Sequence, residues 1–182
     1  MNLEKKSKSN DSLKKVTSKD SFNSSNFKIN EKIKESDKDI DFEELGFALM
    51  EQETLNDLKL GLNKKQVEEK IGVASEFSEN EIWDADGEYH QTYFYKNLGI
   101  ELDMIGDNLD TKKVNMITIY KPCKFKTSSG IAIGSKLSEL EGEYGKYYNK
   151  EFSDKVNFVA GSIYGGVIFT LKNNEVESIF IG

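Results

Sequence analysis

At 182 residues, the chain is long enough for one sizeable domain and too short for two ordinary ones. Its formal net charge is −7, and all 25 of its basic residues are lysines. Because the planar guanidinium of arginine is the usual group for bidentate recognition of phosphate and guanine, an acidic chain without arginine is not expected to bind nucleic acid.

The first 40 residues differ in composition from the rest. They hold ten Lys and seven Asp or Glu, a net +3, whereas residues 41–182 hold 15 Lys and 25 Asp or Glu, a net −10. The first segment is also rich in Ser and Asn, and its few apolar residues cannot offset the entropy lost on ordering. We predict a disordered tail over residues 1–40, with a short transient helix around 30–37 as the alternative, and a single domain over 41–182.

No targeting or membrane-spanning signal is apparent. The N-terminal residues are not followed by a continuous apolar segment, and no apolar run approaches the length of a membrane span. Cys123 is the only cysteine, so no intramolecular disulfide can form. We expect a cytoplasmic protein, or a cell-surface or secreted one if an N-terminal signal has been lost, that is a monomer or a weak oligomer.

The domain is predicted to begin with a helix over residues 41–53, where Phe42, Leu45 and Leu49 have helical spacing. A second helix is predicted to begin at Asn63, because Asn63 and Gln66 have the spacing of a capping box. Gly72 is suited to end that helix in a left-handed conformation.

The second helix belongs to a pattern that occurs twice, 73 positions apart. The first copy is Leu58, Leu60, Gly61, Val67, Ile71 and Gly72, and the second is Ile131, Ile133, Gly134, Leu140, Tyr144 and Gly145. Each copy leads into segments with strand patterns: 81–84, 88–96, 100–104 and 114–120 after the first, and 156–161, 166–171 and 175–181 after the second. Asp86 and Gly87 predict a tight hairpin at 85–87.

The duplicated pattern predicts an α+β fold built from two pseudo-repeats, at residues 54–122 and 126–182. Each pseudo-repeat is expected to contain a helix and an antiparallel sheet, with the helices on one side of the sheet. The glycines and most aromatic residues are then explained by architecture.

The order of elements, with its G-(x)5-[VL]-(x)3-[IY]-G opening, resembles the tandem-repeat fold of β-lactamase inhibitory proteins, and single units resemble small outer-membrane-assembly lipoproteins. Three segments, Leu98–Met104, Lys126–Gly134 and Gly161–Phe169, resemble those of an uncharacterised bacterial protein family. The resemblance covers roughly residues 45–182. It implies a fold and a sheet face that can meet a protein partner, but no individual contact residue.

Acidic residues form one group of candidates. Because strands 88–96 and 98–104 are predicted to be antiparallel, the turn at 85–87 and the loop at 105–112 should lie at the same end of the sheet. Carboxylate oxygens gathered there could hold a hard cation such as calcium. The candidate ligands are Asp84, Asp86, Glu88, Asp103 and Asp107, with Asp110 and His90 nearby. The spacing does not match an EF-hand, and solvated hairpin turns are the favoured interpretation.

Two further patterns are weaker. His90, the only histidine, and Cys123 could formally make a nucleophilic pair, but no feature is expected to activate the thiol. Residues 126–136 resemble a phosphate loop superficially, yet three residues instead of four separate Gly130 from Gly134, and Ser-Lys follows instead of Lys-Ser. We therefore expect no catalytic residues and no cofactor.

Aromatic residues are the other candidates. The side chains considered for partner binding are Trp83, Tyr89, Tyr93, Tyr95 and Tyr164. Residues 93–95 are consecutive, so on a strand one of their rings must point away from the helices. Exposed tyrosine and tryptophan are frequent at interface hot spots, although rings that fill the core remain the alternative. The sequence favours a non-enzymatic protein-binding or inhibitory module with an unidentified protein partner. The alternative is a small-ligand or cation-binding protein that uses the acidic turn end.

Overall fold

A computed structural model describes residues 40–108 and 110–182. The predicted disordered tail lies outside the described residues, apart from Ile40. Residues Asp41–Gly182 form one compact unit. Within the described part, no helix is both long and apolar enough to cross a membrane.

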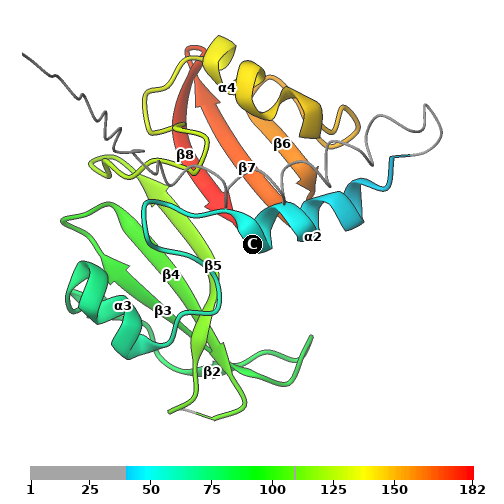
Figure 1. Cartoon of the computed structure of the whole chain (residues 1–182). Coiled ribbons are helices and arrows are strands. Elements are labelled where there is room, and N and C mark those ends of the chain that lie inside the picture. Colours follow the sequence, from blue (N-terminus) through cyan, green and yellow to red (C-terminus); the bar gives the residue numbers. More distant parts are fainter. Residues whose placement is uncertain (1–39, 109) are drawn as a thin grey trace, which may run out of the picture. The chain divides into compact units, whose positions relative to one another are not determined.

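The compact unit contains helices and antiparallel strands (Figure 1). The helices are α2 (Phe42–Gln52), α3 (Lys64–Ile71), α4 (Leu137–Tyr144) and the 3-10 turn η1 (Gly145–Tyr147). The first strands are β1 (Glu76–Phe77), β2 (Glu81–Ile82), β3 (Tyr89–Tyr95), β4 (Ile100–Gly106) and β5 (Lys113–Tyr120). The last are β6 (Asn157–Ser162), β7 (Gly165–Lys172) and β8 (Glu175–Ile181).

The helix starts follow from local capping. The carboxylate of Asp41 accepts hydrogen bonds from the backbone N–H groups of Glu43 and Glu44, both at 3.0 Å, and so begins α2. The predicted capping box at the start of α3 is confirmed, because Asn63 and Gln66 exchange side-chain-to-backbone hydrogen bonds. Gly72 ends α3 with φ of 82°, as expected.

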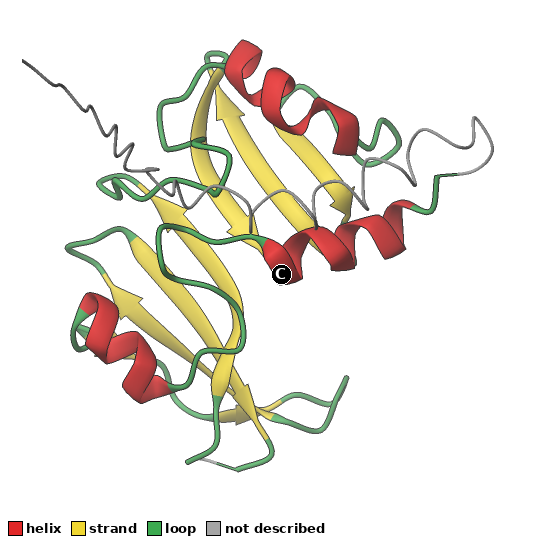
Figure 2. Ribbon diagram, in the orientation of Figure 1, coloured by secondary structure: helices red, strands yellow, loops and turns green. Residues whose placement is uncertain are grey.

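All strands join in one antiparallel sheet of order β1-β3-β4-β5-β8-β7-β6, and β2 also pairs with β3. The expected α+β class with an antiparallel sheet is therefore confirmed. The two three-stranded meanders meet where β5 pairs with β8 from Ile117–Ile181 to Tyr120–Ser178 (Figure 2).

The strand registers of the two meanders match. In the first meander, Leu102 lies opposite Ile117 and a bulge follows Asp103. In the second, Phe169 lies opposite Ile179 and a bulge follows Thr170. An offset of 67 residues relates Leu102 of β4 to Phe169 of β7, and the same offset relates the two bulge positions. The segments before α3 and α4 also pair alike, since the N–H of Gly61 donates to Val114 and that of Gly134 to Val176, both at 2.8 Å.

The predicted hairpin is present, because β2 pairs with β3 and the N–H of Trp83 donates to the carbonyl of Glu88 at 3.1 Å, but its turn is wider than the predicted 85–87. Ile82 pairs with Tyr89, so residues 83–88 form a wider connection, which we call the Trp83 loop. The Asp86 carboxylate accepts a hydrogen bond from the N–H of Glu88 at 3.0 Å, a local Asx turn that competes with a two-residue hairpin. The loop is therefore long enough to fold over the sheet.

The core lies between the sheet and the helices. Glu68 of α3 acts electrostatically on Tyr93 and Tyr95, and the ring of Tyr144 in α4 packs on Phe169 with centroids 4.8 Å apart. At the junction, four fully buried residues extend this core across both meanders: Ile117, Ile119, Ile179 and Ile181. The β5–β8 contact is thus part of one continuous apolar layer.

Candidate functional site

The side of the sheet that faces away from α3 and α4 is the first candidate, and we call it the helix-free face. One cross-strand row on this face runs through every strand of the two meanders. Its members, in sheet order, are Phe94, Glu101, Thr118, Phe180, Ile168 and Val159. All but Val159 are half-buried. Figure 1 shows α3 and α4 on the opposite side.

The helix-free face mixes apolar and polar groups. Glu101 and Thr118 are adjacent polar members of the row, with Phe94 on one side and Phe180, Ile168 and Val159 on the other, and Met116 lies in the neighbouring register position opposite Asp103. The Tyr120 hydroxyl donates to Glu101 at 2.8 Å across β4 and β5. A half-exposed surface of this composition resembles a protein interface more than it resembles a catalytic pocket.

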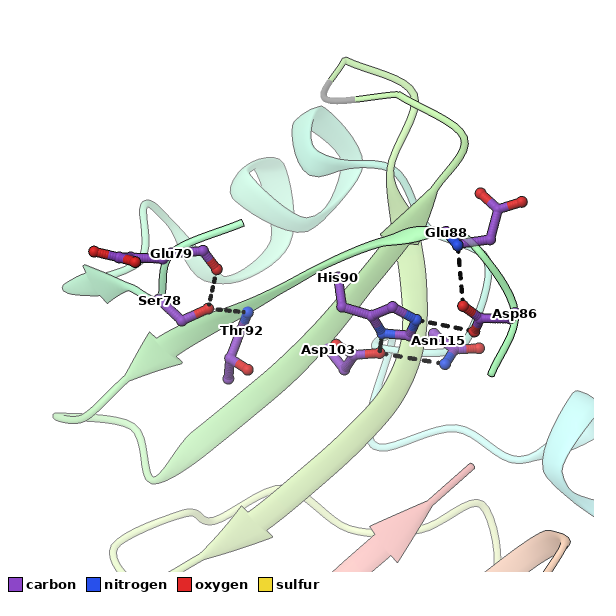
Figure 3. A network of polar contacts seen from close by, with 8 residues as sticks. All are labelled: Ser78, Glu79, Asp86, Glu88, His90, Thr92, Asp103 and Asn115. Carbon is purple, nitrogen blue, oxygen red and sulfur yellow. Dashed lines mark hydrogen bonds and ion pairs between the residues drawn. The ribbon is translucent and has the colours of Figure 1, made fainter. Parts of the chain in front are cut away.

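The only histidine lies at one end of this face. His90 is 3% exposed, and its register partners are Glu81 on β2 and Ile105 on β4. Figure 3 shows its imidazole between the carboxylates of Asp86 and Asp103. Nδ1 lies 2.9 Å from Asp103 Oδ2, and Nε2 lies 3.0 Å from Asp86 Oδ2. The ring therefore links the Trp83 loop to β4.

Three neighbours fix this arrangement. Asn115 Nδ2 donates to Asp103 Oδ2 at 3.2 Å, which orients that carboxylate from β5. The indole of Trp83 is stacked on the imidazole with centroids 3.7 Å apart and planes 4° from parallel. The hydrogen bond from the backbone N–H of Glu88 has the largest effect in lowering the pKa of Asp86, and the hydrogen bond with the His90 ring has the next largest. The carboxylate of Asp86 is thus kept ionised beside the ring.

A buried lysine lies close to the same cluster. The Nζ of Lys112 donates to Gln91 Oε1 at 2.9 Å and also to the side chain of Asn80. Burial lowers the pKa of Lys112, and the charge of Asp103 partly opposes that effect. Lys112 and Asn115 could not be singled out from the sequence, because their roles depend on the bulge that shifts β5 relative to β4.

The five acidic candidates do not form a common set. Asp86 and Asp103 both contact His90, whereas the side chain of Glu88 points away from the ring in Figure 3. Asp84 is exposed, and Asp107 accepts from Thr111 Oγ1 at 2.6 Å within its own loop. Across residues 40–108 and 110–182, no group of three or more His, Cys, Asp or Glu side chains could hold a metal ion. The cation-binding alternative finds no support in this geometry.

Neither Cys123 nor the glycine-rich segment at 126–136 has the surroundings that its proposed chemistry would need. Burial raises the pKa of Cys123, which disfavours the reactive thiolate. In the segment that resembles a phosphate loop, the N–H of Ser128 donates to Glu53 at 2.8 Å and that of Ile131 to Thr127 at 3.1 Å. These amides are engaged within the chain, so they do not form an anion cradle in this conformation.

The aromatic candidates separate into two groups. Tyr93 and Tyr95 are 6% and 4% exposed on the helix side of β3, so for these two candidates the core alternative holds. Burial raises the pKa of Tyr95 to about 12. Tyr89 is half-buried and alternates onto the same side of β3, and Phe94 is the ring of this run that faces away from the helices. Trp83 and Tyr164 are 42% and 68% exposed.

Comparison with known proteins finds no matching family model, no matching curated protein and no matching solved structure. The resemblance to β-lactamase inhibitory proteins therefore remains a prediction from the sequence.

Proposed function

We propose that the protein is a non-enzymatic protein-binding or inhibitory module whose binding surface is the helix-free face. The observation that carries this proposal is the half-exposed row from Phe94 to Ile168, which extends over both meanders without a covering helix. Burial of such a row against a partner protein removes its apolar side chains from water, which is favourable.

Exposed rings near the two edges of the sheet favour the same function. Trp83 lies on the loop beside β3, and Tyr164 lies in the β6–β7 turn, where its ring packs edge-on against Phe152 at 6.3 Å. Tryptophan and tyrosine supply large contact areas for a small loss of side-chain entropy. We assign Trp83 and Tyr164 to the binding surface, whereas Tyr89 lies on the helix side of β3 and is not part of it. Tyr93 and Tyr95 are assigned to the core.

We also propose that the domain consists of two pseudo-repeats, at residues 54–122 and 126–182. Matched registers, matched bulges after Asp103 and Thr170, and helices of equal length support this interpretation. An internal pseudo-two-fold relation would make the helix-free face continuous across the β5–β8 junction. Such a face resembles the open sheet that the inhibitor resemblance implies.

The test compares two variants, each of which adds one lysine to a different side of the domain. Thr118→Lys places an ammonium in the centre of the helix-free face, and Ser138→Lys places the same group on the exposed surface of α4. We expect Thr118→Lys to abolish capture of a partner from native lysate, because a long ammonium side chain at the centre of the row, even opposite Glu101, would have to be desolvated and would disturb the contact surface. The Ser138→Lys variant should retain capture.

Thermal unfolding of both variants completes the test. Thr118 is half-exposed, so we expect its substitution to change the free energy of unfolding by no more than about 1 kcal/mol. Retained capture by Thr118→Lys, or equal loss with Ser138→Lys, would exclude the helix-free face as the binding surface.

A further inference from the structure

We propose that His90 is the titrating element of a latch that holds the Trp83 loop against the sheet and releases it as pH rises. The latch is closed while both ring nitrogens carry protons, and it opens when the ring loses one. This inference concerns the conformation of the chain itself and does not depend on the proposed binding function.

The proton requirement follows from the hydrogen-bond geometry. Carboxylate oxygens, which are acceptors when ionised, face both Nδ1 and Nε2 of His90 at 2.9 and 3.0 Å. A neutral imidazole has one N–H and one lone pair, so in either tautomer one contact becomes a pairing of two acceptors. Both contacts are favourable only with the doubly protonated ring.

The two contacts differ in how easily they can break. The Asp103 side chain is 11% exposed and is also bound by Asn115, whereas the Asp86 side chain is 38% exposed. When the ring becomes neutral, Asp86 can move into water at little cost, and Asp103 cannot. The neutral ring therefore keeps its Nδ1–H bond to Asp103, and the loop that carries Asp86 is released.

Trp83 strengthens the same dependence on charge. Its ring is stacked on the imidazole with centroids 3.7 Å apart, a geometry in which the face of the indole attracts a cation. Loss of the imidazolium charge weakens that attraction. Trp83 and Asp86 lie on one loop, so both contacts that close the loop weaken together.

The charged groups that contact the His90 ring are both carboxylates. Asp86 from the Trp83 loop and Asp103 from β4 contact the ring, Glu81 on β2 is the register partner of His90, and β5 contributes the uncharged Asn115, which binds Asp103. Lys112 opposes them, but its ammonium is bound by Asn80 and Gln91. Because both carboxylate contacts need an N–H from the ring, a rise in pH that removes one ring proton favours opening. At the acidic end, the lowered pKa of Asp86 keeps its carboxylate ionised below the usual range.

The chain contains one tryptophan and one histidine, so each signal has a single source. The full 182-residue protein is titrated from about pH 5 to about pH 9, a range that brackets imidazole titration. Trp83 emission and acrylamide quenching are recorded together with the NMR shifts of the His90 ring. We expect emission to move to longer wavelength and quenching to increase, at the midpoint of the His90 titration.

Two variants with the same loss of charge separate the latch from a general electrostatic effect. In Asp86→Asn, the amide can donate to Nε2 of a neutral ring, so the loop should stay closed and the Trp83 step should disappear. In Asp84→Asn, which changes an exposed residue of the same loop outside the His90 contacts, the step should remain. If Asp86→Asn does not fold, His90→Gln serves instead and should also lack the step.

Three results would overturn the proposal. The first is a Trp83 signal that stays flat over the whole pH range, and the second is a step that persists in His90→Gln. The third is loss of the step in Asp84→Asn as well as in Asp86→Asn, which would show a dependence on loop charge and not on the contact with the ring.

Discussion

The two meanders share a backbone register but place their large side chains differently. In the first meander, a strand residue places an aromatic ring in the core: Tyr95 of β3 is buried. The corresponding position in β6 of the second meander is the small Ala160. In the second meander, a helix residue places the ring in the core: Tyr144 is the last residue of α4, and the corresponding residue of α3 is Ile71. Total core volume can therefore be conserved while individual positions change.

The meanders also differ in polarity on the helix-free face. Asp103 precedes the bulge in the first meander and is bound by His90 and Asn115, whereas Thr170 precedes the bulge in the second. The cluster around His90 is thus a feature of the first meander, although both meanders share the same strand register. The strand register thus reflects the common architecture, and function is to be sought at the positions where the two meanders carry different side chains.

The largest expected effect concerns α2, which packs on the second meander's strands β6 and β7. In Gly46→Ala, the new Cβ would lie 1.8 Å from the carbonyl oxygen of Gly165, a backbone atom that cannot move aside freely. We expect a loss of about 3 kcal/mol in the free energy of unfolding, more than the ~1 kcal/mol gained in helix propensity.

The control for that prediction is Gly142→Ala in α4, where a Cβ would meet nothing within 4 Å. This variant should gain about 0.5–1 kcal/mol from helix propensity alone. Urea denaturation of both variants makes the measurement. Equal effects would show that α2 is not packed closely on the β6–β7 turn.

A smaller effect separates the two buried tyrosines. Tyr144 Oη donates to Glu53 Oε2 at 2.6 Å, while Tyr95 Oη has no hydrogen-bond partner among the described residues. Tyr144→Phe should lower the free energy of unfolding by about 1–3 kcal/mol, because the buried Glu53 loses a donor. Tyr95→Phe should be neutral or stabilising, and destabilisation equal to that of Tyr144→Phe would contradict the comparison.

Helix capping gives a third contrast, worth about 1 kcal/mol. Asn63 caps α3 with its side chain, whereas the equivalent Lys136 makes no side-chain cap on α4. Asn63→Ala should cost about 1 kcal/mol, and Lys136→Ala should change stability by less than about 0.5 kcal/mol. Thermal unfolding monitored by circular dichroism is sufficient, and a larger cost at Lys136 would reverse the assignment.

The smallest contrast is in the acid dependence. Backbone N–H groups lower the pKa of Asp86 in the first meander and of Asp154 in the second below the ordinary value of 3.8. Each carboxylate therefore contributes stability above pH 3.8 that is lost as the pH falls toward its lower folded pKa.

Both side chains are exposed, so Asp86→Asn and Asp154→Asn should each flatten the acid limb of a stability–pH profile only slightly. A steeper acid limb in either variant would mean that the carboxylate destabilises the folded state.

Local signals in the sequence predicted much of the frame. The capping box at Asn63, the left-handed Gly72 and the alternation in β4 all depend on neighbours within a few residues, and all are found in the structure. The sequence left open whether Tyr93 and Tyr95 face the core or a partner, because a strand pattern does not say which of two apolar faces the helices cover. The His90 cluster could not be assembled from sequence, since it depends on the bulge after Asp103 and on the width of the Trp83 loop.

Hydroxyl-radical footprinting of the protein with its captured partner tests the binding surface most directly. Met116 and Phe180 lie on the helix-free face, and Phe77 is 42% exposed on the helix side of the sheet. Our account predicts that the partner protects Met116 and Phe180 from oxidation and leaves Phe77 unchanged. Protection of Phe77 with unchanged oxidation of Met116 and Phe180 would contradict it.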